Sequence, residues 1–412
     1  MLTKPKKISK SLMKQLNQKL VLQILKDHAN ASKSELAKIT GLTIPGVSEI
    51  IHELEHYQLI KNIGESPIKR GRSPVMYEIN KDSFKVIGVT IRSKSIRVGL
   101  FNTLGERLLF SEENLPEDTS PNNIMDYVAI LVRQLLKDSK MSFSDINGIG
   151  LGMHGIVNPI KGISIYPPHL NWRNIPVKQM LEEKLNIPVI IDNDCNTLAL
   201  AEYWFGDGEN LNSFITLNVD YGIGAGIMIN GQLFHGSNFG AGQIGHTIVQ
   251  DNGSLCSCGN YGCLETISSE LSIIEKVKIK IKKGFPSLIT EIAKSPDHIT
   301  LNHLYEAAKQ NDQLALSILE TASRYLGIGI STLVNVFNPE KVILTGGILR
   351  GQDAVMQPLT ESFHTHALLT NIDHLEIVQS KLGQQAGVLG AATLWINELF
   401  KGELPLSSLK SN

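Results

Sequence analysis

The chain has 412 residues, of which 42% are hydrophobic and 19% are charged, and its net charge is −1. This length exceeds one ordinary domain and predicts two or three, each with a core of its own. No apolar run reaches the ~18 residues of a membrane helix, and the N-terminus lacks the apolar segment of a signal peptide. Four cysteines exclude a disulfide framework. We therefore expect reduced thiols in a cytoplasmic protein without a membrane partner.

The charge is divided unevenly along the chain. Residues 1–80 contain 13 Lys and Arg against 7 Asp and Glu, whereas residues 81–412 contain 26 against 33. A small basic head on a larger acidic body is typical of a nucleic-acid-binding module joined to a second function.

Three helices are predicted in the head. Residues 11–28 carry apolar side chains at helical spacing, namely Leu12, Leu16, Leu20, Ile24 and Leu25. A short helix over 35–40 has Ser32 or Ser34 as its cap, and Gly41 supplies the turn that follows. A third helix begins at Thr43, its N-cap, with Pro45 in the first turn and a buried stripe of Val47, Ile50, Ile51 and Leu54.

Helix, glycine turn and helix form a helix-turn-helix, whose second helix enters the major groove of DNA with its first residues at the base edges. Residues 59–79 read as two strands around a basic loop, a wing that reaches phosphates or the minor groove. We therefore predict that residues 1–80 are a winged helix-turn-helix domain. The alternative is a solvated helical bundle with a basic hairpin. The predicted DNA contacts are Thr43, Pro45, Gly46, Ser48, Glu49, Lys69, Arg70 and Arg72.

The remainder of the chain alternates between strands and helices. Strands are predicted over 84–91, 95–102, 106–112, 146–155, 187–194, 213–234 and 341–347, the first three as an antiparallel meander. Helices are predicted over 121–137, 177–185, 265–283, 301–309, 312–336 and 386–399. This pattern favours an α/β architecture in two similar lobes.

Four motifs in this region occur in a fixed order. They are Asp192-Asn193-Asp194 after a strand, Gly222-x-Gly224-x-Gly226, Gly240-Ala-Gly-Gln-Ile-Gly245-His246, and Cys256-x-Cys258-Gly-x-x-Gly-Cys263-x-Glu265. Together they resemble the ROK family of repressors and sugar kinases, over residues 84–400. The segments PPHLNW and NQKLVLQIL are similar to its xylose-repressor branch.

The resemblance implies an actin-like ROK domain over 84–412, with a sugar cleft between two lobes. One lobe would comprise 84–195 together with the C-terminal helix 386–400, and the other would comprise 196–384.

The cysteine cluster matches the donor set of a zinc site. His246, Cys256, Cys258 and Cys263 offer one nitrogen and three sulfur ligands, and Zn²⁺ prefers four such ligands in tetrahedral geometry. Because four protein ligands leave no open position, we expect the zinc to be structural, and the resemblance implies the same ligands. The alternatives are incidental buried thiols and a redox switch. Cys195 lies outside the cluster and is expected to be a packing residue.

The resemblance also implies a sugar site, formed by Gly155, Asn193, Asp194, Gln243, His246 and Glu265. Carboxylates and amides bind paired hydroxyls, and such groups discriminate strongly between sugars. Asp194 matches the general base of the family's kinases. Gln243 stands where the family usually has glutamate, and its amide N–H predicts a ligand with a carbonyl, such as an N-acetyl group.

The segments that bind phosphate in the family's kinases are altered. Their first strand opens with Gly-x-Asp-x-Gly-Gly-Thr, whereas this chain has Gly88-Val-Thr90-Ile-Arg92-Ser93-Lys94. Their second loop, Gly-Thr-Gly, is replaced by Asp220-Tyr221-Gly222, whose carboxylate would repel a triphosphate. Gly346-Gly347, which matches the adenosine-side glycines, is retained. Because phosphate cradles need small residues in tight turns, we predict that the chain is not an enzyme.

We therefore predict a sugar-responsive transcriptional repressor, a homodimer or tetramer that binds a pseudo-palindromic operator in double-stranded DNA and a sugar or sugar-phosphate inducer. One rival is a bifunctional sugar kinase with a DNA-binding head, and another is a metal- or redox-sensing repressor. Delivery of the inducer by a phosphotransferase-system protein partner stays open.

Overall fold

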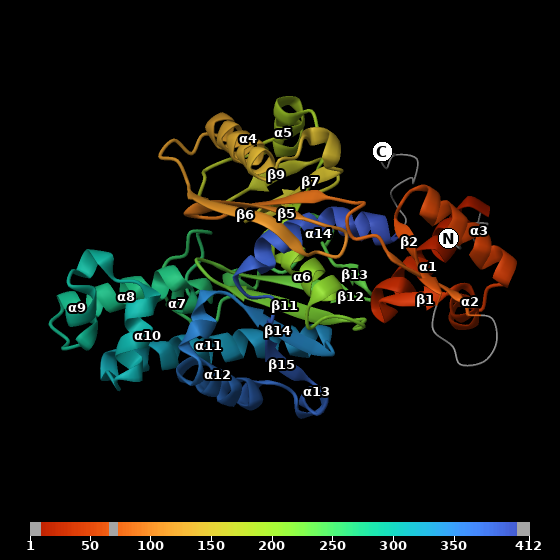
Figure 1. Cartoon of the computed structure of the whole chain (residues 1–412). Helices are drawn as coiled ribbons and strands as arrows, with labels where there is room; N and C mark the ends of the chain where they lie inside the picture. Colours follow the sequence, from red (N-terminus) through yellow and green to blue (C-terminus); the bar gives the residue numbers. More distant parts are fainter. Residues whose placement is uncertain (1–9, 66–72, 402–412) are drawn as a thin grey trace, which may run out of the picture. The chain divides into compact units, whose positions relative to one another are not determined.

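The chain divides into two units (Figure 1), and the computed structural model describes residues 10–65 and 73–401 of it. The first unit comprises Met1–Gly152, Pro176–Ile191 and Ala391–Asn412, and the second comprises Met153–Ile175 and Asp192–Gly390. Among the helices described, none is long and apolar enough to cross a membrane.

The N-terminal head contains the three predicted helices and a three-stranded sheet. Its elements are α1 (Lys10–His28), β1 (Asn30–Ser32), α2 (Lys33–Thr40), α3 (Ile44–His56), β2 (Ile60–Glu65) and β3 (Val75–Ile79), and the sheet order is β1-β3-β2. The loop with Lys69, Arg70 and Arg72 lies outside the described residues. The short strand β1 was not predicted.

The helix-turn-helix forms because both helices have strong local start and stop signals. Ser32 Oγ accepts the backbone N–H of Glu35 at 3.3 Å, and the Glu35 carboxylate accepts the N–H of Ser32 at 2.8 Å. This capping box starts α2 two residues earlier than predicted. Gly41 ends α2 at φ 72°, which glycine adopts without steric cost. Thr43 caps α3 by accepting the N–H of Gly46, as predicted.

The buried face of α1 differs from the predicted stripe. Leu16 and Leu20 are exposed, whereas Val21, Leu22, Ile24 and Leu25 are buried. The buried apolar residues of α1 lie in its second half, and the helix contacts α2, α3, β1 and β3. The side chain of Leu12 is not among those described.

A five-stranded sheet with helices on both faces forms the rest of the first unit. Its order is β10 (Val189–Asn193), β7 (Gly148–Met153), β4 (Val86–Ile91), β5 (Ser95–Phe101) and β6 (Arg107–Asn114). The predicted meander of β4, β5 and β6 is confirmed. The helices α4 (Pro121–Asp138) and α5 (Val177–Leu185) lie together on one face, and α14 (Ala386–Lys401) lies on the other (Figure 1).

The second unit contains a second five-stranded sheet. Its order is β13 (Gln232–Leu233), β12 (Ile223–Ile229), β11 (Phe214–Val219), β14 (Lys341–Thr345) and β15 (Glu376–Gln379). One face is covered by α6 (Asp194–Phe205), and the other by α11 (Gln313–Phe337) and α12 (Asp353–His366) (Figure 1). A separate hairpin joins β8 (Ile156–Asn158) to β9 (Ile163–Tyr166).

The helical part of the second unit is more divided than predicted. The expected helix over 265–283 is two helices, α7 (Glu265–Ser268) and α8 (Glu270–Lys282), because Ser269 leaves the helical conformation and caps α8. The helices α9 (Leu288–Ala293), α10 (Leu301–Lys309) and α13 (Leu369–Ile372) complete this part. In the second unit, sequence analysis missed the helices α9, α12 and α13 and the strands β8, β9 and β15.

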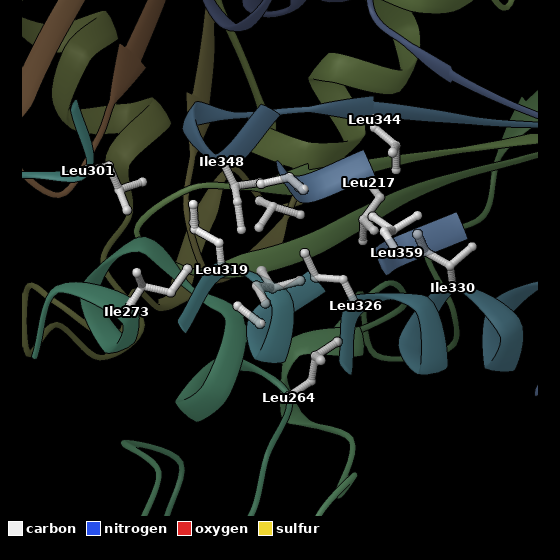
Figure 2. Packing of buried hydrophobic residues seen from close by; sticks show 14 of the residues in the cluster. Leu217, Leu264, Ile273, Leu301, Leu319, Leu326, Ile330, Leu344, Ile348 and Leu359 are labelled. Carbon is white, nitrogen blue, oxygen red and sulfur yellow. The ribbon is translucent and has the colours of Figure 1, made fainter. Parts of the chain in front are cut away.

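The main core of the second unit lies between its sheet and α11. Figure 2 shows Leu217 and Leu344 from the sheet facing Leu326 and Ile330 of α11, with Leu359 of α12 beside them. Leu264, which lies between Cys263 and Glu265 in sequence, belongs to the same core and is fully buried. The cysteine cluster is therefore joined directly to the main core of this unit.

The packing of α14 on β7 yields a stability prediction. A Cβ atom at Gly150 would lie 1.8 Å from the carbonyl oxygen of Ala391, so the strand and helix must separate in Gly150→Ala. We expect the free energy of unfolding in urea to fall by about 2 kcal/mol. Gly240→Ala is the matched control, because a Cβ there meets no atom within 4 Å. Equal stability of the two variants would contradict this packing.

Candidate functional site

The candidate site is assembled on the first residues of β12. A Cβ atom at Gly224 would lie 2.7 Å from Cys195 Sγ, and one at Gly226 would lie 2.1 Å from the Cys195 carbonyl oxygen. The start of α6 therefore approaches the strand more closely than any side chain at these two positions would permit. This approach is what the predicted Gly222-x-Gly224-x-Gly226 motif provides.

Asn193 holds the start of α6 in place. Its Oδ1 accepts the backbone N–H groups of Cys195 and Asn196 at 2.9 and 3.2 Å, and its Nδ2 donates to the Gly155 carbonyl at 2.8 Å. Asn193 thus caps the helix and ties it to the segment that precedes β8. Asp194 follows in the first turn of α6 and is half-buried. Gly155, Asn193 and Asp194 are therefore brought together within the second unit.

A second segment, Gly242–His246, also packs against β12. The Ala225 N–H donates to the Gly242 carbonyl at 2.8 Å, and a Cβ atom at Gly245 would lie 2.4 Å from the Ile223 carbonyl oxygen. These contacts hold the short 3-10 helix Ile244–His246 against the strand. They bring Gln243 and His246, both half-buried, to the same end of β12 as Cys195.

The Glu265 side chain is hydrogen-bonded to β12. Its Oε2 accepts the Ile223 N–H at 3.1 Å, one residue from the glycine that packs against Cys195. The position of Glu265 is set by Leu264, whose side chain packs at Gly329 of α11, where a Cβ would lie 2.6 Å from it. The predicted sugar-binding residues at the start of α6 and those that follow β12 in the sequence are therefore all held near Ile223–Gly226.

The four predicted metal ligands form one cluster. Their ligand atoms all lie within 4.8 Å of one another, with Cys256 Sγ 3.5 Å from His246 Nδ1 and Cys258 Sγ 3.7 Å from Cys263 Sγ. Zn–S bonds of about 2.3 Å and Zn–N bonds of about 2.0 Å in tetrahedral geometry require about 3.5 Å between nitrogen and sulfur and about 3.8 Å between two sulfurs. Two of the ligand pairs are therefore already at the spacing of a zinc site.

Backbone geometry supports this cluster. Leu255 pairs with Tyr261 and Ile248 with Cys263 as isolated antiparallel bridges, and Gly259 N–H donates to the Cys256 carbonyl at 2.9 Å. The tight turn directs N–H groups at sulfur, including that of Cys258 at Cys256. Such donors stabilise thiolates, which are the metal-binding form of cysteine.

The thiols of the cluster differ in acidity. Burial raises the pKa of Cys256, and it raises the pKa of Cys263 to about 12. Partial burial opposes ionisation of Cys258, but N–H donors, that of Asn260 first among them, lower its pKa below the ordinary value. A metal ion must displace protons from the two buried thiols, so its affinity should increase with pH. Cys195 is buried beside β12, as expected of a packing residue.

The predicted DNA contacts of α3 lie at the accessible start of that helix. Thr43, Pro45 and Glu49 are exposed, and Gly46 and Ser48 are half-buried. The opposite face of α3 is buried in the head through Val47, Ile50, Ile51 and Leu54. Sequence analysis missed Ile44, whose large apolar side chain is exposed in the same turn.

Charged side chains lie in or beside the segments that match the phosphate loops of the family's kinases. The Arg92 N–H donates to the Ser95 carbonyl at 2.9 Å, so that Arg92, Ser93 and Lys94 form a hairpin turn. In the second unit, a Cβ atom at Gly347 would lie 3.1 Å from the Arg350 guanidinium and 3.2 Å from the Glu270 carboxylate. Asp220 lies 3.8 Å from the same point. The surroundings of Gly347 thus contain two carboxylates and a guanidinium.

The chain is similar to proteins of known function over almost all of its length. The model of the ROK family matches residues 86–398. The chain is 33% identical to the xylose repressor of Caldicellulosiruptor bescii, over 94% of this chain and 97% of that protein. The crystal structure of a ROK family transcriptional regulator, a homologue of the Escherichia coli MLC protein, matches with a TM-score of 0.84 at 25% identity, over 97% of this chain and all of that one.

A kinase structure covers less of the chain. The ROK family glucokinase from Streptomyces griseus, solved with glucose and AMPPNP, matches with a TM-score of 0.69 at 28% identity. It spans 75% of this chain and 98% of its own.

The contacts of Asn193 predict separable effects of two substitutions. Asn193→Ala removes the cap of α6 and the link to Gly155, and we expect the free energy of unfolding in urea to fall by about 2 kcal/mol. Asn193→Asp retains an oxygen for the cap but places it against the Gly155 carbonyl, so that only the link is lost. Its stability should lie between those of wild type and Asn193→Ala, and an alanine variant as stable as wild type would refute this role.

Proposed function

The chain is a member of the ROK family, and we propose that it is a sugar-responsive transcriptional repressor with a structural zinc ion and no phosphoryl-transfer activity. The observation that carries the proposal is the extent of the likeness. The xylose repressor and the MLC homologue match through the N-terminal head, whereas the glucokinase covers 75% of the chain. The head is thus shared with regulators.

The head, residues 1–80, is proposed to bind operator DNA. The first turn of α3 is accessible, and the excess of Lys and Arg in these residues supplies attraction to phosphates. Thr43, Ser48 and Glu49 have polar side chains for base edges, and Lys69, Arg70 and Arg72 are proposed to reach the backbone or the minor groove. A homodimer would place two such heads on successive major grooves.

The inducer is proposed to bind at the start of β12. Asp194, Glu265 and His246 offer acceptors and a ring nitrogen for paired hydroxyls, and Gln243 offers both a donor and an acceptor. Asp194 would accept a hydrogen bond from a hydroxyl without passing the proton on. The Gln243 amide favours an N-acetylated sugar, and an unchanged ligand preference in Gln243→Glu would remove that part of the proposal.

Zinc is proposed to stabilise this site without taking part in chemistry. The ligands His246, Cys256, Cys258 and Cys263 complete a tetrahedral shell, so no position is open for a substrate. His246 and Glu265 stand at the two ends of the cluster, and fixing the cluster therefore fixes both side chains.

The absence of phosphoryl transfer is supported by the charges at the phosphate segments. An ATP triphosphate would meet the Asp220 carboxylate beside Gly222, and Glu270 and Arg350 stand next to Gly347. Glycine alone is small enough at these turns to leave room for phosphates, and the chain has Arg92, Ser93 and Asp220 where the family's kinases have glycine. The retained Asp194 favours the bifunctional sugar kinase as the second candidate.

Repression would be relieved if the sugar binds the DNA-competent and DNA-incompetent states with unequal affinity. The test is a thermal-shift screen against D-xylose, D-glucose, N-acetyl-D-glucosamine and their phosphates. A ligand at a hundredfold excess over its Kd should stabilise the fold by about 2.7 kcal/mol.

The stabilising sugar should also weaken binding to operator fragments selected from random DNA, as measured by fluorescence anisotropy. ADP release in a coupled assay should stay at background. Sugar-dependent ADP release would establish the kinase instead, and no effect of any sugar on DNA binding would refute the repressor.

The zinc proposal predicts different outcomes for two cysteine variants. Cys258→Ser removes a ligand, so zinc measured by mass spectrometry should fall from one ion per chain to well under half, and the response to sugar should be lost. Cys195→Ser is the control and should retain zinc. Full zinc content in Cys258→Ser would contradict the site, and release of DNA by chelation without sugar would favour a metal-sensing repressor.

A further inference from the structure

A buried carboxylate connects the two segments of the candidate site. Asp192 is the penultimate residue of β10, directly before Asn193, and only 3% of its surface is exposed. Its Oδ1 accepts the Asn193 N–H at 2.6 Å and the Asn196 Nδ2 at 2.9 Å. Its Oδ2 lies 2.8 Å from Nε2 of His235, 43 residues further along the chain. Because an ionised carboxylate only accepts, Nε2–H of His235 is the donor.

His235 begins a loop that leads to the ligand-binding segment. The loop leaves the sheet at Phe234, whose N–H donates to the Ile227 carbonyl at 2.8 Å, and it returns where Ala225 donates to the Gly242 carbonyl. Gln243 and His246 follow directly. A side-chain bond from His235 therefore anchors this loop, between its two sheet contacts, to the turn that carries Asn193 and Asp194.

One residue of the loop between the two sheet contacts has an unfavourable backbone conformation. Phe239 lies at φ 60°, a conformation unfavourable for a bulky side chain. The internal bond from the Ala241 N–H to the His235 carbonyl closes the loop around His235. The histidine ring also packs edge to face against Phe239, with centroids 6.4 Å apart.

We propose that His235 is a positioning residue, which sets the distance between the Asn193–Asp194 turn and the Gln243–His246 segment through its hydrogen bond to Asp192. The inference deepens the proposed sugar site and rests on it for its consequence in binding. Losing the donor would leave a buried carboxylate oxygen without this partner, a state that favours movement of the loop or of the turn.

Two substitutions separate the hydrogen bond from the ring contact. His235→Phe keeps a ring beside Phe239 but cannot donate, whereas His235→Gln keeps an N–H donor at similar reach but has no ring. His298→Ala, at an exposed histidine of the second unit, is the control. The primary readout is hydrogen–deuterium exchange of the backbone amides of residues 234–246 in the full-length protein without ligand.

We expect His235→Phe to exchange about tenfold faster than wild type in this segment, and His235→Gln to remain within about threefold of it. The control should match wild type. Fast exchange in the glutamine variant together with wild-type exchange in the phenylalanine variant would overturn the proposal in favour of ring packing. Unchanged exchange in both variants would overturn it as well, because neither the hydrogen bond nor the ring would then hold the segment.

The second readout is affinity for whichever of D-xylose, D-glucose and N-acetyl-D-glucosamine stabilises the wild type. His235→Phe should bind it on the order of tenfold more weakly, with recovery in His235→Gln and unchanged affinity for DNA without sugar. If no sugar binds the wild type, the proposed function fails, and the exchange measurement still decides the role of His235. Equal sugar affinity in wild type and His235→Phe would overturn the role in binding.

Discussion

The close approach of backbone segments at the start of β12 is the constraint on which the candidate site depends. Gly224 and Gly226 have no side chains, so the first turn of α6 lies directly against the strand. The backbone of Ile223 and Ala225 then bonds Glu265 and Gly242. Polar side chains from three distant parts of the sequence are thus held at one end of β12, partly through their own hydrogen bonds to the backbone.

The cysteine cluster extends this arrangement to the core. His246 and Cys263 belong to the cluster, while the neighbouring Leu264 is buried against α11 and Glu265 bonds β12. A metal ion bound here would couple the loop to both the sheet and α11. In the proposed repressor, zinc would keep the acceptors of the proposed sugar site in fixed positions and would need no catalytic role.

Local signals and long-range contacts were not equally predictable. The capping of α2 and α3 was predicted because Ser32 and Thr43 act on residues two or three positions away. The metal ligands were predicted because their chemistry is specific. The bond between Asp192 and His235 has no local signal, since 43 residues separate its partners. The exposure of Leu16 and Leu20 was not predictable either, because helical spacing alone does not say which face of α1 the neighbouring elements cover.

The central claim is that residues from these separate segments form one sugar site on β12. The most direct test is a crystal structure of the zinc-loaded protein with the sugar that stabilises it most. We predict that the sugar lies next to Ile223–Gly226, with its hydroxyls within hydrogen-bond distance of Asp194, His246 and Glu265. A sugar bound elsewhere, with these side chains free of it, would contradict the account.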